Sequence, residues 1–116
     1  MTEPHDRPTS AELVEAVREF LERDVMSATQ GRVQFHTRVA VNVLNTVQRE
    51  LELGPAQALA HRERLDALGF ADEAELAAAI RAGDVDDRYD EIKAAITATV
   101  TDKLKVANPK YLDPPP

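Results

Sequence analysis

The sequence predicts an all-α protein, a single-domain bundle of about five helices. Three observations carry this prediction. Ala, Leu, Glu and Arg recur at helical spacing, aromatic residues make up only 4% of the 116 residues, and β-branched residues do not alternate with polar ones. A chain of this length corresponds to one domain, and 43% hydrophobic residues can form a packed core. We therefore expect a flexible N-terminal arm over 1–8, a helical domain over 9–108 and a Pro-rich tail over 109–116.

The first helix is expected to begin at a capping box. Thr9 can accept hydrogen bonds from the first-turn amides, and Glu12 can reach back to the amide of Thr9. The helix is expected to end near Met26. Its apolar residues follow one another at helical spacing and form one stripe. These residues are Leu13, Val17, Phe20, Leu21 and Val25.

The central helix is expected over about residues 32–53. Gly54 suits the left-handed conformation that ends many helices, and Pro55 follows it. Pro55 can also serve as the first residue of a third helix, which leads to Gly69. The sequence therefore predicts a helix end between residues 53 and 55.

Two further helices complete the predicted bundle. Asp72 opens a second capping box, and the short helix that follows stops at Gly83. The acidic run at 84–87 favours the positive end of a helix dipole and predicts the start of a fifth helix. Asn108 and Pro109 are predicted to terminate that helix.

The central helix carries a polar ridge and a broad apolar arc. At about 100° per residue, spacings of four, three and four place the four residues of the polar ridge in one narrow sector. The ridge consists of Arg38, Asn42, Asn45 and Arg49. The arc consists of Val33, Ala40, Val43, Leu44, Val47 and Leu51, and Phe35 and Val39 widen it. Because the arc is broad, helix 32–53 is predicted to be the hub around which the other helices pack.

The polar ridge and His36 are the candidate binding residues. The ridge is either a solvated face or internal network, or a recognition strip in which the Arg forks of Arg38 and Arg49 grip a carboxylate or phosphate. His36 projects into the apolar arc, either as a core imidazole or as a proton carrier or metal ligand. The two Asn amides of the ridge, Asn42 and Asn45, could read neutral polar groups. No catalytic residue and no metal site is assigned from the sequence.

The composition excludes several function classes. With no Cys, the chain has no disulfide framework and no Cys-based metal site. The net charge of −7 argues against nucleic-acid binding and against an anionic membrane surface. No apolar run approaches the ~20 residues of a membrane span, and the N-terminus lacks the pattern of a secretory signal. We expect a cytoplasmic protein without a cofactor.

Three stretches of the chain carry a family resemblance. They are GRVQFHTRVAVNVL at 31–44 with Arg49-Glu50-Leu51, AIRAGD at 79–84 and KLKVANPKYL at 103–112. Over residues 9–112 the chain resembles an uncharacterised bacterial family of small helical proteins. Members are encoded beside an aminoglycoside-phosphotransferase-like kinase and an acyl-CoA dehydrogenase-like flavoprotein. That pairing is similar to enzymes that process hydroxylated acyl-CoAs by phosphorylation and elimination. The resemblance therefore implies a metabolic context for the chain and not an activity.

Three functions stay open at this point. The favoured one is a non-catalytic accessory or regulatory subunit that binds the kinase or the dehydrogenase-like protein through the polar ridge. The second is a small acyl-CoA or phosphorylated-ligand binding protein or enzyme, with His36 and Arg38 in its site. The third is a structural homodimer that pairs through a row on the fifth helix. That row consists of Ile92, Ile96 and Val100.

Overall fold

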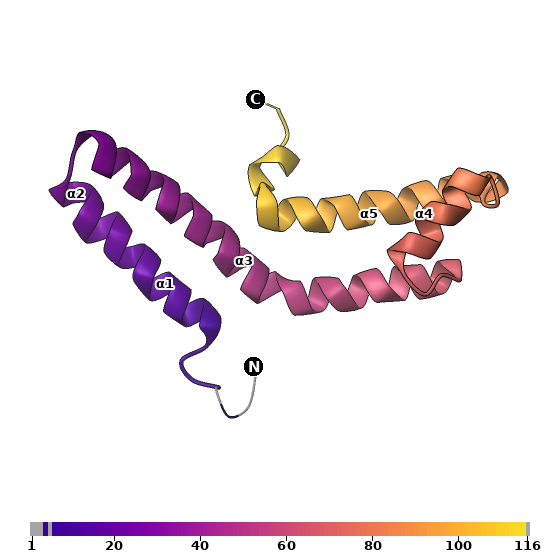
Figure 1. The fold of residues 1–116 in the computed structure, drawn as a ribbon, viewed down its shortest axis with the longest axis horizontal. Helices are drawn as coiled ribbons and strands as arrows, with labels where there is room; N and C mark the ends of the chain where they lie inside the picture. Colours follow the sequence, from indigo (N-terminus) through magenta and orange to yellow (C-terminus); the bar gives the residue numbers. More distant parts are fainter. Residues whose placement is uncertain (1–3, 5, 116) are drawn as a thin grey trace. The chain divides into compact units, whose positions relative to one another are not determined.

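A computed structural model describes residue 4 and residues 6–115 of the chain. Regular structure in these residues is entirely helical, which confirms the all-α class (Figure 1). The elements are α1 (Ser10–Phe20), the π turn η1 (Leu21–Val25), α2 (Met26–Ala28), α3 (Gly31–Leu68), α4 (Glu73–Ala82), the 3-10 turn η2 (Asp86–Arg88), α5 (Tyr89–Ala107) and the 3-10 turn η3 (Pro109–Leu112). Residues 1–3 and 5 of the predicted arm, and residue 116 of the predicted tail, lie outside the described residues.

The described residues form three long helices rather than the predicted five or so. The segment from α1 through α2 is one helix, α3 and α5 are the others, and α4 is shorter. The predicted helix end at Gly54 is wrong, because α3 continues through Pro55. Proline normally disfavours the α conformation of the preceding residue by clashing with its Cβ, and Gly54 has no Cβ. The helix ends instead at Gly69, whose φ is 90°.

The predicted capping box at Thr9, the N-cap at Asp72 and the helix end at Gly83 are confirmed. The Thr9 hydroxyl accepts from the Glu12 amide at 3.1 Å, and the Glu12 carboxylate accepts from the Thr9 amide at 2.8 Å. At the start of α4, Asp72 Oδ1 accepts from the Glu75 amide at 2.9 Å. Gly83 ends α4 in the left-handed conformation with a φ of 79°. These local motifs are complete within four residues of sequence, and each fixes one helix boundary.

The chain divides into two compact units, Met1–Gly54 and Pro55–Pro116, called unit 1 and unit 2 below. Unit 1 is a helical hairpin in which α1 lies antiparallel to the first part of α3 (Figure 1). The seam includes a polar contact, in which Arg18 Nε donates to Gln48 Oε1 at 3.3 Å. At the turn, Gln34 Nε2 donates to the carbonyl oxygens of Met26 and Thr29, at 3.0 Å each.

The predicted hub of the bundle is not formed in unit 1. Val43 is 56% exposed and Val47 is 36% exposed, although both were predicted to lie in the core. The buried residues among those described in unit 1 are Thr37 and Val41. A single neighbouring helix covers one flank of α3 only, and α1 lies against the flank of Thr37 rather than against the apolar arc. The arc therefore stays on the surface of the hairpin.

The apolar core of the described residues lies in unit 2. Its buried side chains come from the end of α3, from α4, from the turn before η2 and from α5. They are Leu65, Leu68, Leu76, Val85 and Ile92. Because Ile92 is 6% exposed, the row predicted to form a dimer surface is partly used inside this core. Ile96 and Val100 remain 42% and 48% exposed.

Candidate functional site

The polar ridge lies on the first part of α3, in unit 1. Arg38 and Asn42 are exposed, whereas Asn45 and Arg49 are half-buried. Arg49 Nη2 donates to Thr46 Oγ1 at 3.1 Å. The ridge is therefore divided: two of its residues are open to solvent, and one arginine takes part in contacts within its own helix.

His36 is exposed rather than buried in a core. Its ring lies edge-on to the ring of Phe35, with 5.4 Å between the ring centroids and 78° between the planes. Phe35 itself is 58% exposed. His36 therefore sits among the exposed apolar residues of α3, and Arg38 lies on another side of the same helix.

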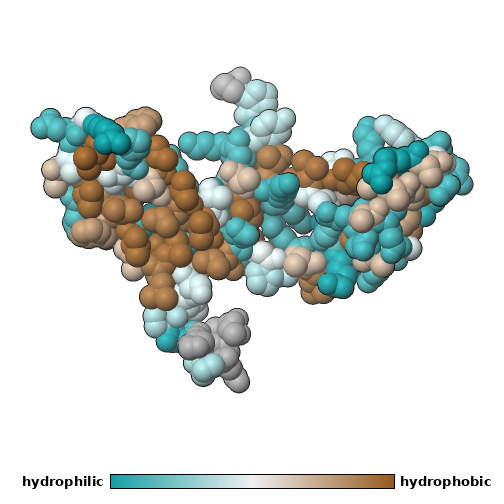
Figure 2. Space-filling view, in the orientation of Figure 1, coloured by the Kyte–Doolittle hydropathy of each residue, from teal (hydrophilic) through white to brown (hydrophobic). Residues whose placement is uncertain are grey.

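An apolar surface, here called the hairpin face, crosses both helices of unit 1. Figure 2 shows it as a brown area that extends from α1 across to α3. Its side chains are between 36% and 56% exposed. They are Leu13, Val17, Phe20, Val33, Val39, Val43, Val47 and Leu51. Single exposed apolar residues are normal on protein surfaces, but a continuous patch of eight is not.

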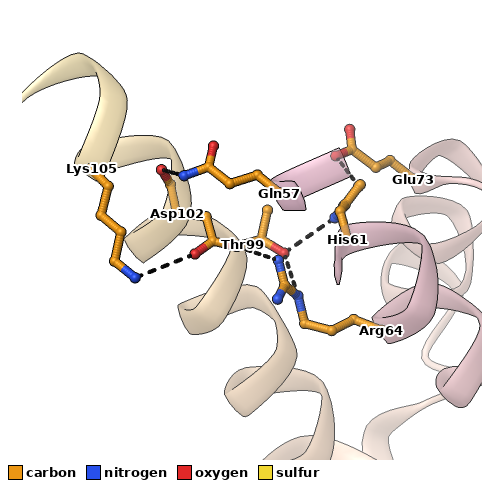
Figure 3. A network of polar contacts seen from close by, with 7 residues as sticks. All are labelled: Gln57, His61, Arg64, Glu73, Thr99, Asp102 and Lys105. Carbon is orange, nitrogen blue, oxygen red and sulfur yellow. Dashed lines mark hydrogen bonds and ion pairs between the residues drawn. The ribbon is translucent and has the colours of Figure 1, made fainter. Parts of the chain in front are cut away.

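A polar network joins α3, α4 and α5 within unit 2 (Figure 3). His61 Nε2 lies 2.7 Å from Glu73 Oε1, and His61 Nδ1 lies 3.3 Å from Thr99 Oγ1. Arg64 Nε donates to the same Thr99 oxygen at 3.3 Å, and Arg64 Nη2 pairs with Asp102 Oδ2 at 3.1 Å. This network fastens α5 to α3 from one side and α4 to α3 from the other.

The outer end of the network adds further contacts to Asp102. Gln57 Nε2 donates to the Asp102 carbonyl oxygen at 2.8 Å, and Lys105 Nζ lies 3.8 Å from Asp102 Oδ1. The Arg64 and Asp102 side chains are 23% and 22% exposed. Because these two charges are partly desolvated and paired, the ion pair contributes more than a fully exposed pair would.

Three side chains of the clamp are arranged like a catalytic triad: the Thr99 hydroxyl contacts the His61 imidazole, which contacts the Glu73 carboxylate. In such a triad they would be the nucleophile, the base and the group that orients the base. However, Arg64 Nε donates a hydrogen bond to the Thr99 hydroxyl oxygen, which is the atom that a nucleophile would use for attack. Thr99 also lies inside α5, where backbone amides are engaged in helical hydrogen bonds and cannot stabilise an oxyanion. This geometry fits a structural clamp between helices better than a catalytic centre.

A shallow apolar groove of about 240 Å³ lies beside this clamp. Its apolar lining includes Leu65, Leu76, Ile96 and Val100. The clamp residues His61, Arg64, Glu73 and Thr99 also line it. Ligand sites for small molecules commonly measure about 300–1,000 Å³. The groove is therefore small for a ligand as large as an acyl-CoA.

The sequence reasoning missed the clamp. Gln57, His61 and Arg64 follow one another at spacings of four and three, which places them on one face of α3. Thr99 and Asp102 repeat at a spacing of three on α5. That matching periodicity was a usable signal, but a lone sequence does not state which polar faces meet.

Arg88 is a second structural contact that the sequence did not reveal. Its Nη1 donates to the Leu68 carbonyl oxygen at 3.1 Å, which satisfies a group at the C-terminus of α3. Its Nη2 lies 3.0 Å from Glu91 Oε1. The hydrogen bonds between the two side chains raise the pKa of Arg88 and lower the pKa of Glu91.

Two searches of the described residues bear on other site types. No group of three or more His, Asp or Glu side chains is arranged to hold a metal ion in this part of the chain. No helix among the same residues combines the length and the apolar character needed to cross a membrane.

Comparison with known proteins places most of the chain in one family. A family model described as a domain of unknown function, DUF6285, matches residues 27–111. The chain matches no curated protein and no solved structure. The match includes the polar ridge, His36 and the clamp, and it begins after α1.

Proposed function

The chain belongs to the DUF6285 family, a domain of unknown function, and we propose that it is a non-catalytic accessory subunit that docks on other polypeptides through its α1–α3 hairpin. The hairpin face is the observation that carries this proposal. It places eight large apolar side chains on the surface of one unit. Contiguous exposed apolar surface of this kind marks protein-interaction sites.

The polar ridge offers a second contact surface on the same hairpin. By helical spacing, Arg38 and Asn42 lie on the side of α3 away from Val43 and Val47. A guanidinium such as that of Arg38 can bind a carboxylate through two parallel hydrogen bonds, and an amide can bind either a donor or an acceptor. We propose that the apolar face supplies the affinity of docking, and that these exposed polar groups form a separate contact on the opposite side of α3.

The family resemblance supplies the proposed partners. We expect an aminoglycoside-phosphotransferase-like kinase or an acyl-CoA dehydrogenase-like protein, within a system that acts on hydroxylated acyl-CoAs. The clamp geometry supports a role without catalysis, because Arg64 donates a hydrogen bond to the Thr99 hydroxyl that contacts His61. The partner assignment itself rests on the resemblance.

The alternative of an acyl-CoA or phosphorylated-ligand site is supported by two hollows of unit 2. The groove of about 240 Å³ would take a short apolar group, and a more open hollow of about 480 Å³ is lined in part by His61, Arg62 and Glu73. The residues predicted for such a site, His36 and Arg38, lie in unit 1 and do not line this groove. The ligand-binding alternative is therefore less well supported than docking.

Co-purification tests the proposed function. A tagged chain is expected to retain the kinase or the dehydrogenase-like protein at near-physiological salt. Val43→Asp should abolish retention, because a carboxylate in the docking surface would have to be desolvated. Leu59→Asp is the matched control, since Leu59 is 59% exposed on α3 but lies outside the hairpin face. Recovery of neither protein, or equal loss with both variants, would contradict the proposal.

A further inference from the structure

The polar clamp of unit 2 also forms part of the lining of the apolar groove. Walls from three helices surround the groove, with Leu65 on α3, Leu76 on α4 and Ile96 on α5. The clamp residues His61 and Arg64 lie among the same lining residues. An apolar cavity of about 150 Å³ can hold a six-carbon ring. At about 240 Å³, the groove therefore has room for the alkyl part of a small amphipathic molecule.

The cations beside the groove are fixed, which favours an anionic ligand. Arg64 Nη2 pairs with Asp102 Oδ2 at 3.1 Å, and the Arg64 side chain is 23% exposed. Lys105 Nζ lies 3.8 Å from the other oxygen of Asp102, so one carboxylate balances two cations at this end of the clamp (Figure 3). A ligand carboxylate is attracted by the remaining positive charge, whereas a ligand cation is repelled by it.

Glu73 already places a carboxylate at the groove, and this carboxylate can move away. Its Oε1 lies 2.7 Å from His61 Nε2, although the Glu73 side chain is 73% exposed. Since an ionised carboxylate only accepts hydrogen bonds, His61 Nε2 is the donor, and a neutral imidazole can donate in this way too. Glu73 and His61 also line the more open hollow of about 480 Å³, into which the Glu73 side chain can turn. The start of α4 can stay in place, because its capping group is Asp72.

The apolar lining continues along α5 beyond the groove. A second apolar hollow of about 260 Å³ shares Ile80 and Ile96 with the groove and adds Ile92 and Tyr89. Ile80 and Ile96 are 41% and 42% exposed, so a ligand on them would remove apolar surface from water. A lining that follows one helix fits an extended alkyl chain better than a compact ring.

We propose that the groove binds a straight-chain aliphatic carboxylate. The ligand carboxylate replaces that of Glu73 on His61 Nε2, and the alkyl chain lies along the apolar lining from α4 and α5. This inference goes beyond the proposed function, because the hairpin face lies in unit 1 and the groove lies in unit 2.

An NMR titration of the ¹⁵N-labelled full chain with butanoate, pentanoate and hexanoate tests the proposal. The affinity is expected to rise about fourfold for each added CH₂, which is the usual gain from burying a methylene. The largest amide shifts are expected in α4 and near Ile96. Hexan-1-ol, which has the same chain length without the charge, is expected to bind more weakly than hexanoate.

Glu73→Gln tests the exchange of carboxylates on His61. The variant removes the competing charge, so hexanoate is expected to bind about fivefold more tightly, since a hydrogen bond to a charged group is stronger than one to a neutral group. The affinity for hexan-1-ol is expected to stay the same, because the alcohol does not replace a carboxylate.

Two adjacent alanines of α4 test the position of the alkyl chain. Ala77 lines the groove, whereas Ala78 is exposed and is not part of that lining. Ala77→Leu is expected to fill the groove and abolish hexanoate binding, and Ala78→Leu is expected to leave binding unchanged. Leucine is nearly as good a helix former as alanine, so both variants should keep α4.

Several results would overturn the proposal. They are no binding of hexanoate at millimolar concentration, equal binding of hexanoate and hexan-1-ol, and an unchanged hexanoate affinity in Glu73→Gln. Hexanoate binding that survives Ala77→Leu, with the largest amide shifts in α1, would place the ligand on the hairpin face instead. None of these measurements involves the kinase or the dehydrogenase-like protein, so the docking proposal is tested separately.

Discussion

Gln48 lies in the seam of the hairpin and uses both ends of its side-chain amide. Its Oε1 accepts from Arg18 Nε at 3.3 Å, and its Nε2 donates to Glu15 Oε2 at 3.4 Å and to Glu52 Oε1 at 3.1 Å. Partly buried polar groups are costly unless they are satisfied. This single residue therefore favours one register of α1 on α3.

Glu12 gives the start of α1 a dependence on pH. Hydrogen bonds from the Thr9 amide and hydroxyl, and then the charge of Arg7, hold the pKa of Glu12 below the ordinary value of 4.5. Because the folded pKa is the lower one, the ionised cap stabilises the fold fully above about pH 4.5. That stabilisation is lost as the pH falls through the folded pKa.

Chemical denaturation of the wild type and of Glu12→Gln at several pH values tests this dependence. The variant is expected to be less stable near neutrality, and the difference in unfolding free energy should shrink as the solution is acidified below pH 4.5. Glu91→Gln separates the effect of the helix cap from that of an ion pair, because the pKa of Glu91 is also lowered but mainly by its hydrogen bond with Arg88. A difference for Glu12→Gln that does not change with pH would contradict the assignment.

At the scale of elements, the helix boundaries that depend on local motifs could be predicted from the sequence. Whether α3 ends or continues at Gly54 and Pro55 could not. Thr9 and Asp72 cap their helices through residues three positions away, so a short window of sequence contains the whole interaction. Gly54 and Pro55 have the composition of a helix end, yet the same pair is compatible with a helix interior. Sequence periodicity also located the apolar arc of α3 but did not reveal which flank α1 covers.

The same distinction between local and long-range features applies to the candidate sites. The positions of the polar ridge follow from spacing along one helix, so Arg38 and Asn42 could be proposed from sequence. The clamp could not, because His61 and Thr99 are 38 residues apart and meet only through the packing of α3 and α5.

Replacing Pro55 tests how much the interior proline costs α3. Pro55 removes one backbone donor from the helix and crowds the preceding turn, which costs about 3 kcal/mol in a regular helix interior. Pro55→Ala is expected to raise the unfolding free energy by about 1–3 kcal/mol, since proline also restricts the unfolded chain and offsets part of the gain. Denaturant unfolding measures the change. A loss of stability would show that Pro55 has a favourable role that the helix geometry does not reveal.

At the scale of the whole molecule, docking and stability should be linked. A partner that covers the hairpin face binds the folded chain only, so mass action raises the melting temperature of the chain when the partner is added. We expect the melting temperature of the wild type to rise with the concentration of the kinase or dehydrogenase-like protein and that of Val43→Asp to stay constant. Differential scanning calorimetry over a series of partner concentrations provides the measurement, and parallel behaviour of the wild type and the variant would count against the link.

The interior proline has one more consequence, for how α3 opens. Position 55 has no N–H, so the Leu51 carbonyl cannot receive the usual bond from four residues further on. Helices ordinarily fray from their termini, where the hydrogen-bond ladder is incomplete. Here the ladder is also interrupted midway, at the residue where the two units join. Solvent exchange of backbone amides is therefore expected to have a further starting point in the middle of α3, besides its two ends.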